Sequence, residues 1–248
     1  LFWHTSISKG NRVYVIGGTN FSGDVSSVYL GIINSNGVID NWQSLTPLPQ
    51  ASRLGGAIIL NNTLYYAHGT TILKTNINFD GTIGSWQSAG TLPHFLSGFG
   101  LVEHNNHLIL IGGKIETDPD TEKVYYTRLN PDGNINGWNE TNHLPHVVNR
   151  GQVIKNENKL LLIGGAGPGP EYFTTTYYTT INADGTVEPW ATSSYTLPQP
   201  VCCAGIAIST NNYLYITGGY GNGYLNTVYY TKLQSSSQEL AVPLLKQT

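Results

Sequence analysis

The sequence predicts an all-β protein made of five copies of one repeat unit, arranged as the blades of a five-bladed β-propeller. Three features recur in the same order about every 50 residues: a Gly-Gly step after an apolar run, an Asx-Gly pair, and a Trp followed by Leu-Pro. Self-similarity at this period is typical of propellers, whose blades are four-stranded antiparallel sheets. The composition agrees, because 29 Gly, 12 Pro and 16 Tyr suit short strands joined by tight turns.

The repeat accounts for nearly all 248 residues as a single domain. The predicted units are 1–47, 48–91, 92–143, 144–196 and 197–248. The Gly-Gly steps are Gly17-Gly18, Gly112-Gly113, Gly164-Gly165 and Gly218-Gly219, with His68-Gly69 as a degenerate copy, and the tryptophans are Trp42, Trp86, Trp138 and Trp190. Unit 5 has no such tryptophan, so we expect the C-terminal tail to supply its outer strand. We expect blade 1 to close the ring on blade 5; the alternative is five units cut from a ring of six or seven.

In chain order, unit 1 should contain strands at 2–8, 12–16, 25–33 and 38–45. Asn36-Gly37 between the last two supplies the positive φ angles of a hairpin turn. In unit 2 the distance from His68 to Trp86 is shorter than in the other units, which predicts only a tight turn around Gly69 between its second and third strands. The glycines and tryptophans of the repeat are expected to serve packing. Function should therefore depend on positions where the units differ.

Charge and hydropathy restrict the partners. The net charge is −3 and there is no basic run, which argues against nucleic acid. No apolar stretch reaches the roughly 20 residues needed to span a bilayer, so we expect no membrane insertion. Low charge with abundant Gly, Tyr, Thr and Asn favours a secreted or cell-surface protein. The lack of methionine fits a processed mature protein or an excised piece, and Asn20, Asn61 and Asn139 stand in glycosylation triplets.

The order of apolar strand, Gly-Gly, Tyr-bearing strand, Trp and Leu-Pro resembles the kelch repeat, whose units form β-propellers. The resemblance covers all five units, although unit 2 departs at Gly-Gly and unit 5 at Trp. It implies the fold and leaves the activity open, because kelch proteins include oxidases, sugar mutarotases, scaffolds and adhesins. The copper oxidases of this family use a Tyr–Cys crosslink that nothing here matches. We expect no metal and no cofactor.

Several residues differ between units and are candidates for a site. Cys202-Cys203 can form a strained vicinal disulfide or remain two reduced apolar side chains. His94 and His146 each follow Leu-Pro, on the connection that leads toward the central channel. They can share a position beside the channel as ligands or a catalytic pair, or be polar residues of the rim, which is the interpretation we favour. Arg53 enters an inner strand near the same face, as does Arg150. Both can hold an anionic ligand or cap strand ends.

These features favour a non-catalytic recognition module that binds carbohydrate. Tyrosine rings can stack on sugar C–H surfaces while Asn and backbone groups supply hydrogen bonds. The predicted surface comprises Tyr220, Asn222, Tyr224, Tyr172 and Phe173, with Arg53, Arg150, His94 and His146 as further ligand-binding candidates. The partner would be a glycan or a surface protein. Two alternatives remain: a protein-interaction or structural domain of a larger extracellular assembly, and an enzyme resembling the sialic-acid mutarotases. The enzyme would use the two arginines and two histidines around the channel.

Overall fold

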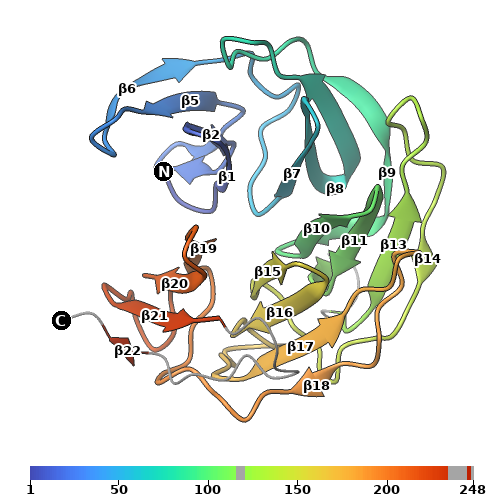
Figure 1. The fold of residues 1–248 in the computed structure, drawn as a ribbon, viewed down its shortest axis with the longest axis vertical. Coiled ribbons are helices and arrows are strands. Elements are labelled where there is room, and N and C mark those ends of the chain that lie inside the picture. Colours follow the sequence, from blue (N-terminus) through green and yellow to red (C-terminus); the bar gives the residue numbers. More distant parts are fainter. Residues whose placement is uncertain (116–120, 234–244, 247–248) are drawn as a thin grey trace.

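The structure is a computed structural model, and it describes residues 1–115, 121–233 and 245–246. These residues form strands and turns, and no helix occurs among them. Five antiparallel sheets follow one another around a central axis as five blades, which confirms the predicted five-bladed β-propeller (Figure 1). Each blade runs from an inner strand near the axis to an outer strand at the periphery.

The blades take their strands in chain order. Blade 1 comprises β1 (Thr5–Lys9), β2 (Arg12–Ile16), β5 (Val28–Ile33) and β6 (Ile39–Ser44). Blade 2 comprises β7 (Gly56–Leu60), β8 (Thr63–Asn76) and β9 (Gln87–Ser97), and blade 3 comprises β10 (Gly100–His104), β11 (His107–Ile111), β13 (Val124–Arg128) and β14 (Asn139–Glu140). Blade 4 comprises β15 (Gln152–Asn156), β16 (Lys159–Ile163), β17 (Thr176–Thr180) and β18 (Ala191–Thr192). Blade 5 comprises β19 (Gly205–Ile208), β20 (Tyr213–Thr217), β21 (Val228–Lys232) and β22 (Leu245–Lys246).

Three short strands lie in the loops. β3 (Thr19–Asn20) and β4 (Gly23–Asp24) form a small hairpin in blade 1, and β12 (Lys114–Ile115) pairs with β9 at the edge of the blade 2 sheet. In unit 1 the inner strand starts at Thr5 rather than at Phe2, which makes only a single bridge to Thr19. β9 passes the predicted unit boundary at 91, because the outer strand of blade 2 remains extended into the connection.

Blade 2 has the shortened turn that its spacing predicts. β8 is one continuous run of 14 residues, yet the N–H of Ile77 just after it donates to the carbonyl of Asn62 just before it. Its two ends therefore lie side by side, and the strand folds back on itself near Gly69, which has a positive φ of 60°. In blade 5 the pairing of β21 with β22 confirms that the C-terminal tail supplies the outer strand. The predicted equivalent of tryptophan in this unit, Val242, lies outside the described residues.

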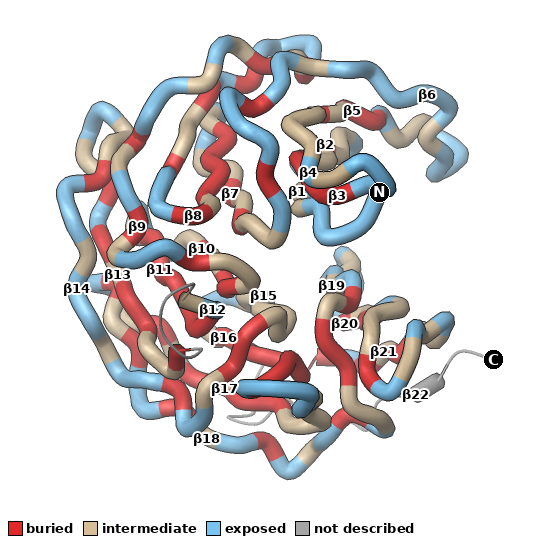
Figure 2. Tube along the Cα trace, turned by 180° about the vertical axis from the view of Figure 1, so that it is seen from behind, coloured by how far each residue is buried: buried red, intermediate tan, exposed pale blue. Residues whose placement is uncertain are grey.

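The hydrophobic core is divided among the junctions between blades. Alternate residues of each strand point to opposite faces of its sheet, so apolar side chains from one blade meet those of the next. Four clusters result, at the junctions of blades 1 and 2, 2 and 3, 3 and 4, and 4 and 5. In Figure 2 the buried positions follow the strands, and the peripheral connections are mostly exposed. No such cluster joins the described residues of blades 5 and 1, so the expected direct closure of blade 1 on blade 5 is not met.

Candidate functional site

The strand register defines two faces of the ring. In blade 1, Thr5 pairs with Ile16 and Ile16 with Val28, so the loop after Gly17-Gly18 lies at the end of the sheet where the inner strand begins. The same pairing recurs in blades 3, 4 and 5. The Asx-Gly turns lie at the opposite end. We call the first end the loop face, because the longest and most variable loops occur there.

A ring of left-handed residues surrounds the channel at the loop face. One residue just before each inner strand has φ between 53° and 62°: Trp3, Leu54, Gly98, Arg150 and Cys203. Backbone hydrogen bonds join consecutive members of the ring. The N–H of each residue from Leu54 onward donates to the carbonyl of the member before it, and the four distances are 2.9, 2.8, 2.6 and 3.1 Å in chain order. These bonds fix the inner ends of the blades relative to one another. All five residues line a central cavity of about 400 Å³.

Arg150 brings a guanidinium to the edge of this cavity. Its Nε donates to Oδ1 of the buried Asn149 at 2.6 Å. A Cβ on Gly98 would lie 2.8 Å from Cγ of Arg150, so the missing side chain at that position leaves room for the arginine stem. Arg150 is thus held by neighbours and points its charge toward a polar, solvent-accessible hollow. The structure agrees with the prediction that it enters an inner strand at this face.

Cys203 lines the same cavity, and the buried Cys202 precedes it in the chain. Both are free thiols, and their Sγ atoms are 3.3 Å apart. The hydrogen bond from the Cys202 thiol lowers the pKa of Cys203 to about 7, and the nearby Arg150 charge acts in the same direction. The same hydrogen bond, together with burial, raises the pKa of Cys202. Cys203 is therefore the more nucleophilic of the pair near neutral pH.

Arg53 lies on the loop face beside the first member of the ring. Its guanidinium lies 5.1 Å from the centre of the Trp3 ring and 3.4 Å from a carboxylate oxygen of Asp24. Phe2 makes an edge-to-face contact with Trp3 at 5.2 Å. All four side chains are at least one-third exposed, so the ion pair contributes little to stability. The partners of the Arg53 charge are therefore two side chains, Trp3 and Asp24, and not the backbone carbonyls that capping of a strand end would use.

Three tyrosines from two blades form a continuous aromatic patch on the loop face. Tyr172 contacts Tyr220 edge to face at 5.5 Å, and Tyr220 contacts Tyr224 in the same way at 5.2 Å. Tyr224 is 94% exposed. Two backbone hydrogen bonds join Tyr220 to Cys202, so the patch adjoins the channel ring. We call these three residues the tyrosine patch.

The loop that carries the patch is held by its backbone. Tyr220 forms a β-bridge with Tyr224, and the N–H of Gly221 donates to the carbonyl of Gly223 at 3.0 Å. A Cβ on Gly221 would lie 2.3 Å from the carbonyl oxygen of Pro200, so this turn packs closely on the preceding connection. Asn222 is exposed at the tip of the turn. The aromatic rings are therefore positioned before any ligand arrives.

One member of the predicted surface lies apart from the tyrosine patch. Phe173 packs its ring against the cluster between blades 3 and 4, and its N–H and carbonyl both take part in backbone hydrogen bonds. It follows Tyr172 on an extended segment, where neighbouring side chains point to opposite sides. Tyr172 therefore contributes to the patch, whereas Phe173 supports the loop from below.

The predicted histidines do not reach the channel. Nε2 of His94 lies 3.1 Å from the hydroxyl of Tyr125, and His146 is exposed on the connection that leads into blade 4. Neither residue lines the central cavity. The Leu-Pro sequence that precedes each histidine still belongs to the outer connection, several residues before the chain turns inward. The expectation that His94 and His146 share a position beside the channel is therefore wrong.

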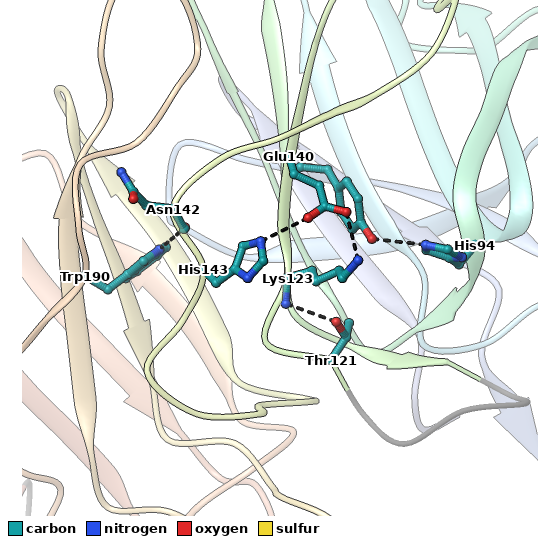
Figure 3. Close-up of polar contacts among 8 residues, drawn as sticks. His94, Thr121, Lys123, Glu140, Asn142, His143 and Trp190 are labelled. Atoms are coloured by element: carbon teal, nitrogen blue, oxygen red, sulfur yellow. Dashed lines mark hydrogen bonds and ion pairs between the residues drawn. The ribbon is translucent and has the colours of Figure 1, made fainter.

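Sequence reasoning did not find the polar network near His94. In Figure 3, Glu140 lies between Lys123 and His143, with distances of 2.8 Å to Lys123 Nζ and 3.1 Å to His143 Nε2. The hydrogen bond from Lys123 lowers the pKa of Glu140 and raises that of Lys123. These side chains are exposed at the periphery of blade 3. Glu140 and His143 are only three residues apart, but Lys123 comes close to them through the strand pairing of Tyr125 with Glu140. No local sequence pattern could therefore have identified the whole network.

A second cavity lies at the opposite face, between blades 2 and 3. It has a volume of about 580 Å³, and Lys74 within it donates to the carbonyl of Asp132 and to Oδ1 of Asn134 at 2.6 and 2.7 Å. Thr75 also lines it, and the buried hydroxyl of this residue has no hydrogen-bond partner among the described residues. The described residues contain no group of three side chains able to hold a metal ion. Nor does the part of the chain that is described contain a helix able to cross a membrane.

Comparison with known proteins supports the fold. No protein-family model matches the sequence, and a search of curated proteins finds no match. Among solved structures, that of YjhT matches with a TM-score of 0.73 and 17% sequence identity, covering 99% of this chain and 84% of that chain. In all, 394 chains of solved structures match, so the architecture is widely shared and does not by itself indicate one activity.

Proposed function

We propose that this propeller is a non-catalytic carbohydrate-binding module of the kelch type on a secreted or cell-surface protein, and that the tyrosine patch is its binding surface. The observation that carries the proposal is the series of three tyrosines ending in Tyr224, whose ring is almost fully exposed. An aromatic face left in water is unfavourable unless a ligand covers it, and a sugar ring offers apolar C–H groups of matching size.

The surroundings of the patch supply the polar half of such a site. Asn222 at the turn carries both donor and acceptor groups, and the hydroxyl groups of the tyrosines can donate or accept. The backbone pairing of Tyr220 with Tyr224 and with Cys202 reduces the entropy that binding would cost. A shallow, rigid, aromatic surface of this kind suits a neutral sugar at the end of a glycan.

The two arginines extend the candidate site toward the channel. Arg150 lines the central cavity next to Cys203, and Cys203 adjoins the residue that pairs with Tyr220. A longer glycan with a carboxylate could therefore contact the patch and the guanidinium together. The mutarotase-like alternative needs His94 and His146 beside these arginines, and neither histidine lines that cavity. No observation favours it over binding.

A glycan array probed with the purified, labelled chain tests the proposal, followed by calorimetry on any glycan that binds. Tyr224→Ala should weaken binding at least tenfold, equivalent to about 1.4 kcal/mol, because exposed aromatic anchors carry much of the energy of such interfaces. Tyr224→Phe should retain most of the affinity, because the ring is kept. Phe79→Ala is the matched control, since Phe79 is also fully exposed but lies in the turn at the opposite face.

Two results would reject the proposal. A blank array with well-folded protein would exclude glycan binding and leave protein interaction, tested by crosslinking on the surface of cells that display candidate partners. Binding that Phe79→Ala reduces as strongly as Tyr224→Ala would show that the ligand does not depend on the tyrosine patch.

A further inference from the structure

The ring has five blades but only four hydrophobic junctions among its described residues. The inner strands of neighbouring blades pack side by side at four junctions: β1 with β7, β7 with β10, β10 with β15, and β15 with β19. The inner strands β19 and β1 do not pack in this way. Figures 1 and 2 show the ring open at this point, with β6 and β22 far apart on its two sides. One face of blade 1 and one face of blade 5 are thus left without a neighbouring sheet.

The open face of blade 1 carries the same residue pattern that is buried elsewhere. The second strands of blades 2 to 5 each place two large apolar residues against the preceding blade, and all are buried: Leu64, Tyr66, Leu108, Leu110, Leu160, Leu162, Leu214 and Ile216. The corresponding residues of blade 1 are Val13 and Val15, and both are only half-buried. Blade 1 is therefore built to receive a preceding blade.

The tryptophans show the same contrast. At three junctions the indole Nε1 donates to a carbonyl of the preceding blade's outer connection: Trp86 to Thr46 at 3.2 Å, Trp138 to Thr91 at 2.9 Å and Trp190 to Asn142 at 3.1 Å. Trp42 holds this position in blade 1, but no described residue precedes that blade to accept its hydrogen bond. Trp42 is 44% exposed, compared with 9% for Trp190.

The open face of blade 5 carries an aromatic cluster. Tyr213, Tyr215 and Tyr230 lie within 6.4 Å of one another on the side away from blade 4, and the rings of Tyr215 and Tyr230 are stacked. Tyr215 holds the same strand position as Tyr14 in blade 1 and Tyr65 in blade 2. Both of those hydroxyls donate to the turn glycine of the next blade, Gly81 at 2.9 Å and Gly133 at 3.2 Å. Tyr215 has no such acceptor among the described residues.

The Gly-Gly step of blade 5 also lacks its neighbour. In blades 1, 3 and 4 the N–H of the second glycine donates to a carbonyl of the next blade at 2.7, 2.9 and 2.8 Å. Gly219 makes no equivalent bond to a described residue. A Cβ on the first glycine of the step would lie 2.3 Å from the next blade at Gly164. At Gly218 the nearest atom of the described residues would be 3.5 Å away, in the same blade. Both open faces therefore present the residues of a blade interface, and no described residue forms a sheet between them.

We propose that a sixth four-stranded blade of the same repeat type, formed by a further part of the same polypeptide, fills the gap between blades 5 and 1. It would offer an Asx-Gly turn carbonyl to Tyr215 and an outer-connection carbonyl to Trp42, as its counterparts do at the other junctions. The chain enters blade 1 by its inner strand and leaves blade 5 by its outer strand, the direction of every connection between blades.

The proposal can be tested by appending a copy of residues 92–143 after Thr248. This unit is the suitable probe because its neighbours resemble the two open faces. In its native place, the Gly133 carbonyl of this unit accepts a hydrogen bond from the Tyr65 hydroxyl of blade 2, and its Asn142 carbonyl accepts one from Trp190 of blade 4. In the gap, the same two carbonyls would accept from Tyr215 and Trp42. The 248-residue chain and the extended chain would each be compared with their Trp42→Ala and Trp190→Ala variants by thermal unfolding and light scattering.

The sixth-blade proposal gives a specific pattern. Trp42→Ala should lower the unfolding midpoint of the 248-residue chain by less than half the shift caused by Trp190→Ala, whereas in the monomeric extended chain the two shifts should be equal. Phe replacements substitute if an Ala variant fails to fold. If the 248-residue chain is a monomer and the two shifts are equal, the ring closes on itself. If it is a dimer and the two shifts are equal, a second copy covers Trp42. Either result would overturn the proposal, as would a Trp42 shift unchanged by the appended unit.

Discussion

Replacing Thr75 with valine should stabilise the protein, whereas the same replacement at Thr179 should destabilise it. The two threonines hold the same position in the third strands of blades 2 and 4, and both are buried. The hydroxyl of Thr179 donates to the carbonyl of Glu188, which lies just before the outer strand β18, at 2.6 Å. Thr75 lines the cavity between blades 2 and 3, and no group in the described part of the chain forms a hydrogen bond with its hydroxyl. Valine has nearly the same shape and lacks the hydroxyl.

The size of the effect follows from the hydrogen bond. Losing a typical buried hydrogen bond costs about 1 kcal/mol net, so Thr179→Val should lower the free energy of unfolding by that amount. An unsatisfied buried hydroxyl costs about 1–3 kcal/mol, so removing it in Thr75→Val should raise stability by about 1 kcal/mol or more. The resulting difference of about 2 kcal/mol corresponds to roughly 4–8 °C in unfolding midpoint for a domain of this size. Calorimetry on both variants would check it. Equal losses would show that Thr75 is already bonded, for example to an ordered water.

Three further predictions concern charge, sulfur and packing. Two hydrogen bonds from Thr186, one from its N–H and one from its hydroxyl, lower the pKa of the Asp184 carboxyl. The stabilisation that Asp184 contributes is therefore present near neutral pH and is lost as the pH falls below about 4. In Asp184→Asn, the free energy of unfolding measured with urea should vary less between about pH 5 and pH 2. Alkylation of Cys203 by iodoacetamide should increase through pH about 7, and Cys202→Ala should move that midpoint upward; mass spectrometry that finds Cys202 modified first would contradict this order. Gly164→Ala should cost at least about 2 kcal/mol in urea unfolding, because its φ is positive and its Cβ would lie 2.3 Å from the carbonyl oxygen of Val201. A loss below about 0.5 kcal/mol would mean that the two blades move apart easily.

The sequence predicted the architecture well because each repeat marker has a direct structural reason. Gly-Gly recurs because its φ angles are positive and because the next blade's carbonyl leaves no space for a Cβ. The missing residues of unit 2 predicted its tight turn, because a shorter chain can only shorten the connection between two strands that must still pair. Exact strand starts were less predictable. The residues just before β1 are held by the channel ring rather than by a sheet, and no pattern in Phe2 to His4 shows this.

The site was only partly predictable. Tyr172, Tyr220 and Tyr224 were singled out by their unusual loops. In the structure Tyr220 forms a β-bridge with Tyr224 and contacts the ring of Tyr172, so the three side chains lie together. His94 and His146 were misplaced because their position after Leu-Pro gives no measure of how far the chain must travel before it turns inward. The kelch resemblance could not correct that error, since it concerns packing residues and not loops.

The channel ring shows why function and packing are separable in this fold. A left-handed residue other than glycine costs about 1–2 kcal/mol, and four of the five ring positions carry such residues: Trp3, Leu54, Arg150 and Cys203. Only Gly98 uses the residue that stability alone would favour, and its empty space admits the stem of Arg150. The backbone bonds of the ring need no particular side chain, so each blade can place a different group at the cavity without altering the fold. The same freedom in the loops produces the tyrosine patch beside the ring, so the side chains presented at this face are ones that the repeat does not dictate.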